Sequence, residues 1–217
     1  MIEAVIFDMD GLMIDSEPIQ SQSFETVLKE YGREPICDDQ GIVQIVGVSA
    51  RDNWSLLKKR YGIEEDIQIL IEKKRAAYIS LLRKGVVPMP GLSSLLDHLR
   101  DHQVKKAIGS SSSKEHIDLV VTQLNLQRDF DVLVSGEQIK RGKPAPDIFL
   151  EIASQLHVSP TDCIVLEDAF SGVEAGKNAG MKVIAVPNRF TARHDFTRAD
   201  KVVLSLQHVN WGMISSM

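Results

Sequence analysis

Short, uninterrupted apolar runs recur along most of the chain and predict the strands of a buried sheet. The first run is Ala4–Phe7. Four to eight apolar residues without alternation are typical of a strand that is buried on both faces. Later runs of the same kind, the first of them less purely apolar, span residues 104–109, 132–134, 163–166, 183–186 and 202–204.

Segments with helical periodicity separate these runs. In 92–99, leucines stand at Leu92, Leu95, Leu96 and Leu99, the spacing that places apolar side chains on one face of a helix. Similar spacing occurs in 117–124, 148–156 and 173–179, and Ser112 and Ser171 each precede a glutamate by three residues, as in a capping box. Alternation of strands and helices with short links predicts an α/β fold, a parallel sheet with helices on both faces.

One interval departs from this alternation. Between about residues 17 and 84 the pattern predicts helices only, over 20–31, 51–61 and 67–82, and no buried strand. Glycines and prolines at 85–91 then mark the return to the sheet. We therefore expect a core domain made of residues 1–15 and 88–217, with an all-helical cap inserted at 16–87.

The composition narrows the class of protein. The chain has 217 residues with 43% hydrophobic and 25% charged residues, as in ordinary globular proteins, and its net charge of −5 gives no electrostatic case for nucleic-acid binding. No stretch of 18 apolar residues and no signal peptide is present, so we expect a cytoplasmic protein without a membrane partner. Two cysteines make no disulfide framework, and the six histidines are scattered, mostly at expected helix surfaces, and have no predicted role.

Paired acidic residues follow two of the predicted strands. Asp8 and Asp10 come directly after the first run, and Glu167 and Asp168 come after the run at 163–166. Ligands of open α/β sheets bind outside the carboxyl ends of the strands, and carboxylate oxygens suit Mg²⁺. Each pair by itself also fits a polar turn at a strand exit. If the two strands are neighbours, however, Asp8 and Asp168 share one ion.

Two further features suit a phosphate group. Ser110 and Ser111 stand where a predicted strand leads into a helix, a position at which backbone N–H groups attract anions, although simple helix capping also explains a serine there. Lys143 precedes a helix whose start is set by Pro144 and Pro146, although it could equally belong to a solvated run of charge.

Taken in order, these elements resemble the haloacid dehalogenase (HAD) superfamily and, within it, the β-phosphoglucomutase-like phosphatases. The resemblance covers essentially the whole chain. Its motifs are Phe7–Pro18, Ile108–Ser111, Gly142–Phe149 and Val165–Gly176. It implies a Rossmann-like core with an inserted helical cap, and a monomer as the default for this type of cap.

The resemblance also implies roles for the site residues. Asp8 attacks phosphorus and forms an aspartyl-phosphate, and Asp10 is the general acid and base, which the dehalogenases of the superfamily lack. Mg²⁺ is held by the Asp8 carboxylate, the Asp10 backbone carbonyl and Asp168, with Glu167 holding a metal-bound water or a ligand. Phosphoryl oxygens are bound at Ser110, Ser111 and Lys143.

Cap residues favour a phosphatase over a mutase. The mutases share the turn Gly47-Val48-Ser49 and the basic residue at Lys74, but have a histidine or basic residues where this chain has Gln20, Val46 and Ala50. A mutase must hold a bisphosphate at both ends, so the lost cations weaken that alternative.

We expect the cap to select a small phosphorylated metabolite, a sugar phosphate or a nucleotide monophosphate. The candidate contacts are Gln20, Val46, Ala50, Trp54 and Lys74, although packing between cap helices is the favoured explanation for Trp54. A non-catalytic binding module is a third alternative. The intact Asp8, Asp10 and Lys143 argue against it, because a binding module needs no second aspartate.

Overall fold

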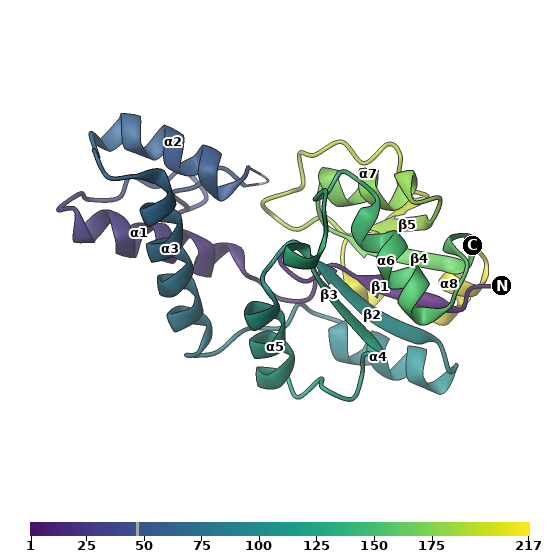
Figure 1. Ribbon diagram of the computed structural model, residues 1–217. Helices are drawn as coiled ribbons and strands as arrows, with labels where there is room; N and C mark the ends of the chain where they lie inside the picture. The colour runs from purple at the N-terminus through teal and green to yellow at the C-terminus, as the bar shows by residue number, and fades with distance from the viewer. Residues whose placement is uncertain (47) are drawn as a thin grey trace. The chain divides into compact units, whose positions relative to one another are not determined.

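The structure, a computed structural model, describes residues 1–46 and 48–217, and it divides into two compact units (Figure 1). The first unit joins Met1–Asp15 to Val87–Met217, and the second is Ser16–Val86. None of the described helices combines the length and the apolar character needed to cross a membrane.

The first unit is built on a parallel sheet of six strands in the order β3-β2-β1-β4-β5-β6. The strands are β1 (Ala4–Phe7), β2 (Lys105–Ser110), β3 (Val132–Ser135), β4 (Cys163–Glu167), β5 (Lys182–Ala185) and β6 (Lys201–Val202). The continuous apolar runs are explained by burial on both faces: all four residues of β1 have no exposed surface. The predicted parallel sheet is confirmed.

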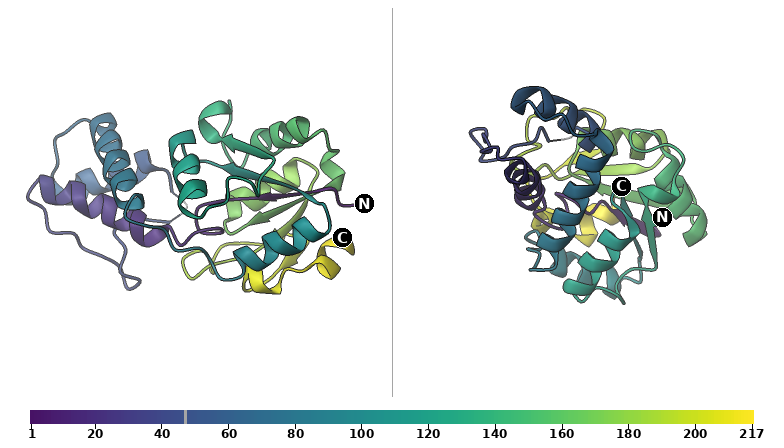
Figure 2. Two further views of the ribbon diagram at one scale, coloured as in Figure 1. Left: turned by 90° about the horizontal axis from the view of Figure 1, so that it is seen from below. Right: turned by 60° about the vertical axis from the view of Figure 1, so that its left-hand side comes forward.

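Helices cover both faces of this sheet (Figure 2). On one face, α6 (Asp147–Leu156) and α7 (Phe170–Asn178) pack against alternate strand residues such as Ile6 and Val165. On the other, α4 (Leu92–Asp101) buries its four leucines, and the ring of His102 at its end stacks on Trp211 of α8 (Trp211–Ser215) at 4.4 Å. The remaining elements are α5 (Lys114–Gln123), between β2 and β3, and the 3₁₀ turns Gly136–Gln138, Pro160–Asp162 and Leu206–His208.

Among its described residues, the second unit contains three helices and no strand. These are α1 (Glu17–Glu30), α2 (Ala50–Tyr61) and α3 (Ile67–Leu82). Their apolar faces meet in a small core in which the Trp54 ring lies 5.1 Å from the Phe24 ring. In the first turns of α2, the Asn53 side chain accepts a hydrogen bond from the Ile45 N–H at 2.8 Å and donates to the Val48 carbonyl at 3.1 Å, so it holds both of these backbone groups.

Three local predictions are wrong. The apolar run at 202–204 forms no buried strand: β6 is a two-residue edge strand, and Leu204 is 85% exposed. Helix α5 is capped by Ser113 because the hydroxyl of Ser112 bonds to Asp10 instead. Helix α7 begins at Phe170, ahead of Ser171, and the Glu167 side chain accepts from the Ala169 N–H at its start.

Gly91, at the start of α4, supports a prediction about stability. Its φ is +95°, and a Cβ there would lie 2.3 Å from the backbone nitrogen of Gln207. Left-handed backbone costs a residue with a side chain about 1–2 kcal/mol and overpacking adds about 1–3 kcal/mol, so we expect Gly91→Ala to lower the free energy of unfolding by about 2–5 kcal/mol. Urea denaturation measures this loss.

Gly180→Ala is the matched control, because Gly180 also has a positive φ, +77°, but no atom within 4 Å of the added Cβ. We expect it to lose only the backbone cost of about 1–2 kcal/mol. Equal losses in the two variants would mean that the Gln207 backbone moves away without cost.

Candidate active site

The register of the central strands brings the motif residues to one edge of the sheet. Strand β1 lies between β2 and β4, and Phe7 is paired with both Ile108 and Leu166. The residues that follow these partners, Asp8 and Glu167 among them, therefore emerge side by side. This is the carboxyl edge of a parallel sheet, where ligands of such folds bind.

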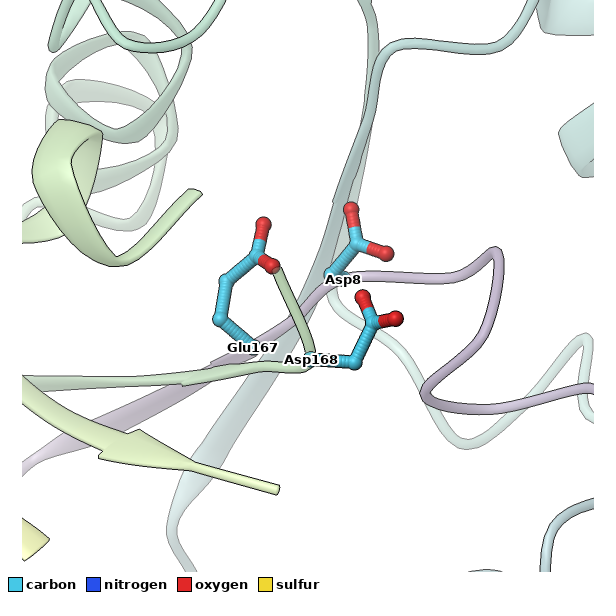
Figure 3. Close-up of side chains that lie close together, drawn as sticks. All are labelled: Asp8, Glu167 and Asp168. Atoms are coloured by element: carbon cyan, nitrogen blue, oxygen red, sulfur yellow. The ribbon is translucent and has the colours of Figure 1, made fainter. Parts of the chain in front are cut away.

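Three carboxylates meet at this edge. Asp8, Glu167 and Asp168 are all buried, and one carboxylate oxygen of each lies within 4.8 Å of the others (Figure 3). Asp8 comes from the end of β1 and the other two from the end of β4. Buried oxygen donors at this spacing are a ligand set that suits a hard divalent cation such as Mg²⁺.

Lys143 joins the cluster from the loop before α6. Its Nζ donates to Asp8 Oδ1 at 2.5 Å, to Glu167 Oε1 at 2.7 Å and to the Gly109 carbonyl at 3.0 Å. The side chain is only 6% exposed. Burial opposes its charged form, but the Asp8 and Glu167 carboxylates outweigh burial and raise the Lys143 pKa above its usual value. Lys143 therefore stays a cation.

One lysine does not neutralise the cluster. Burial, and next the charge of Glu167, raise the pKa of Asp8 to about 8, although Lys143 acts to lower it. The cluster thus carries more negative charge than Lys143 compensates by itself. A divalent cation relieves such repulsion, so the residues present fit the predicted Mg²⁺.

Asp10 and the serines form a second group beside the first. The hydroxyl of Ser112 donates to Asp10 Oδ2 at 2.7 Å, and that of Ser110 lies 3.4 Å from the same oxygen. Ser110 is buried at the end of β2, where its Oγ also accepts from the Ser112 N–H at 3.1 Å. Ser111, the next residue along, is exposed. The side chain of Asp10 is thus held by hydroxyl groups, apart from the carboxylate cluster.

His116 is a neighbour of Asp10 that sequence reasoning missed. The histidines were expected mostly at helix surfaces without a role, but His116 is 4% exposed and its Nε2 lies 3.6 Å from Asp10 Oδ1. The signal was its spacing: His116 stands four residues before Val120, on the buried stripe of α5. A polar residue on an apolar stripe indicates a polar neighbour.

The predicted cap residues separate into two groups. Gln20, Val46, Ala50 and Lys74 line one pocket of about 240 Å³ in the second unit, together with Glu17, Phe24, Gln44, Ile45, Val48 and Asn53. Trp54 is fully buried in the helical core, so its assignment as a substrate contact is wrong and its role is packing. Gly47, of the turn shared with the mutases, lies outside the described residues.

Lys74 is held by its surroundings in that pocket. Its Nζ donates to Gln20 Oε1 and lies 5.1 Å from the centre of the Phe24 ring and 4.9 Å from that of Tyr78. Nearby, the Gln44 amide donates to the Glu17 carboxylate at 3.0 Å. The pocket is thus a polar surface with one cation and one anion among the described residues that line it.

Comparison with known proteins agrees with this geometry. A phosphorylated carbohydrates phosphatase from Thermotoga maritima is 34% identical over 84% of this chain and 84% of its own length. A bifunctional riboflavin kinase/FMN phosphatase from Arabidopsis thaliana is 32% identical over 96% of this chain, which spans only 55% of that protein.

The crystal structure of a β-phosphoglucomutase from Clostridium difficile superposes with a TM-score of 0.79 at 28% identity, covering 100% of this chain and 96% of that one. Residues 5–186 match the family of haloacid dehalogenase-like hydrolases. That match takes in the carboxylate cluster, Lys143 and the whole helical unit. The chain belongs to the haloacid dehalogenase-like hydrolases, as its motifs predicted.

Proposed function

We propose that this protein is a Mg²⁺-dependent phosphatase that hydrolyses a small phosphorylated metabolite of the sugar phosphate or nucleotide monophosphate type. The observation that carries the proposal is Lys143, which bridges Asp8 and Glu167 at the carboxyl edge of the sheet. A buried cation beside a strand-end aspartate suits a site where an anion meets a carboxylate nucleophile. The phosphatase names of the relatives support the same reaction.

Asp8 is the nucleophile in this proposal. One of its oxygens attacks phosphorus in line, the ester bond to the leaving oxygen breaks, and Asp10 gives its proton to that oxygen. Water then attacks phosphorus and gives a proton to Asp10, and the bond between phosphorus and the Asp8 oxygen breaks, which releases inorganic phosphate and restores the Asp8 carboxylate. Lys143, Ser110 and Ser111 bind phosphoryl oxygens, because phosphoryl transfer depends on positioning and on stabilising charge.

The metal would be held by the carboxylates of Asp8 and Asp168 and by the backbone carbonyl of Asp10, with Glu167 acting through a water molecule. When bound, Mg²⁺ supplies positive charge that offsets the repulsion between the nucleophile and the phosphate. The chain contributes the buried oxygens and Lys143, whose positive charge favours the ionised form of Asp8 and acts against the rise of its pKa.

A sugar-phosphate mutase is the second candidate, favoured by the likeness to β-phosphoglucomutase. A mutase must bind a second phosphate in the cap. Lys74 is the one cation among the described lining residues of the cap pocket, where Glu17 offsets its charge and Gln20 accepts its hydrogen bond. This balance favours a neutral, hydroxyl-rich group there and hence a monophosphate substrate.

Phosphate release from a panel of sugar phosphates and nucleoside monophosphates tests the proposal. We expect release with Mg²⁺ from at least one member, and its loss on chelation with EDTA, because the carboxylate cluster then lacks its counter-charge. Isomerisation of β-glucose 1-phosphate without loss of phosphate would favour the mutase. If the protein binds these compounds but catalyses neither reaction, the non-catalytic binding module would be the remaining explanation.

A further inference from the structure

Asn188 connects two parts of the candidate site that lie far apart in the sequence. It stands in the loop after β5. Its Nδ2 donates to Asp168 Oδ2 at 2.8 Å and to the backbone carbonyl of Gly11 at 3.1 Å. Asp168 belongs to the carboxylate cluster, and Gly11 directly follows Asp10. One amide group thus joins the β1 loop to the β4 loop.

Two backbone N–H groups in the Asn188 loop fix the orientation of this amide. Its Oδ1 accepts from the N–H groups of Phe190 at 2.8 Å and Thr191 at 3.2 Å. Separately, the backbone N–H of Asn188 donates to Thr191 Oγ1 at 3.1 Å, and Thr191 is 2% exposed. Because the amide oxygen already faces two backbone donors, the amide nitrogen has to face Asp168 and Gly11.

The contact leaves no room for a side chain at Gly11. A Cβ on this glycine would lie 2.5 Å from Asp168 Oδ2 and 2.8 Å from Asn188 Nδ2. The three groups therefore pack directly, without a side chain between them. A hydrogen bond to one carboxylate oxygen restrains rotation of the Asp168 carboxylate, and so sets where its other oxygen points.

We propose that Asn188 is a positioning residue that orients the Asp168 carboxylate for Mg²⁺ and ties it to the loop that carries Asp8 and Asp10. The inference rests on the proposed function for the identity of the metal. When a residue that orients a metal ligand through a hydrogen bond is removed, metal affinity or activity typically falls by about 10–100-fold. Asn188 itself needs no contact with the metal or the substrate.

Isothermal titration of the metal-free protein with Mg²⁺, without substrate, tests this inference. We expect Asn188→Ala to weaken Mg²⁺ binding by about 10–100-fold. Hydrolysis of p-nitrophenyl phosphate should then need more Mg²⁺ for half-maximal rate, with kcat recovering toward the wild-type value at saturating Mg²⁺. A general loss of structure would lower kcat at every Mg²⁺ concentration. Asn188→Ser, too short to reach both acceptors, should change Mg²⁺ affinity in the same direction if the alanine variant does not fold.

Thr191→Val is the matched control. It removes the hydroxyl that accepts from Asn188 N–H but leaves the side-chain amide in place. We expect its Mg²⁺ affinity to stay within about two-fold of wild type. An unchanged affinity in Asn188→Ala, or an equal loss in Thr191→Val, would overturn the inference, as would a wild-type protein that binds no Mg²⁺. A wild type that binds Mg²⁺ but hydrolyses nothing contradicts the proposed function alone.

Discussion

We expect Asp8→Asn to remove phosphate release while the fold is retained. An amide is not a nucleophile toward phosphorus, so we expect kcat to fall by a factor on the order of 10⁴ or more, as for other essential nucleophiles. The fold tolerates the change because burial and Glu167 raise the pKa of Asp8 to about 8. Near neutral pH the metal-free site therefore already favours an uncharged group at this position, and asparagine supplies one of the same shape.

Two measurements check this expectation. Phosphate release is followed with the best substrate of the panel, and thermal unfolding is followed in EDTA, where we expect no loss of stability. Asp39→Asn is the matched control, because Asp39 is an exposed acid in the second unit, and it should keep wild-type activity. Activity above about a hundredth of wild type in a folded Asp8→Asn variant would exclude Asp8 as the nucleophile.

The position of the site could be predicted from the sequence because parallel strands end at a common edge. Once Asp8 and Glu167 were placed after neighbouring strands, their meeting followed from the fold. The same reasoning fails for contacts made across loops. Asn188 stands in a loop with no periodic pattern, and its bond to Asp168 depends on the path of a chain that local sequence does not encode.

Burial was harder to predict than secondary structure. Leu204 lies in an apolar run but at the edge of the sheet, where nothing covers 85% of its surface. For Trp54 the sequence left a ligand contact open beside the favoured packing role, and the ring fills the core of three helices, because a large aromatic ring contributes most where it is fully enclosed. The burial of Leu204 and that of Trp54 both depend on which helices and strands pack together. The residue pattern along one helix or strand does not contain that information.

Lys143→Met is the second change with a large expected effect. Methionine has similar length but offers no donor, so Asp8, Glu167 and the Gly109 carbonyl each lose a hydrogen bond. Breaking a buried ion pair from one side costs about 3–5 kcal/mol, and protonation of Asp8 reduces the loss. Loss of one group that stabilises transition-state charge lowers kcat by about 10²–10³-fold.

The pH dependence separates this charge effect from a packing effect. The folded-state pKa of Asp8 is about 8, above its unfolded value of 3.8, so its ionisation destabilises the metal-free fold as pH rises through this interval. Lys143 counteracts that destabilisation. We therefore expect the stability deficit of Lys143→Met, measured by urea denaturation in EDTA, to be smaller near pH 5 than near pH 9.

Two variants serve as controls for Lys143→Met. Lys140→Met makes the same change at an exposed lysine three residues earlier and should change neither activity nor stability. Lys143→Arg keeps the charge but replaces a compact ammonium by a planar fork, so we expect it to retain most of the stability and little of the activity. A deficit for Lys143→Met that is constant from pH 5 to pH 9 would mean that Lys143 supports the site by packing, and that Asp8 and Glu167 do not depend on its charge.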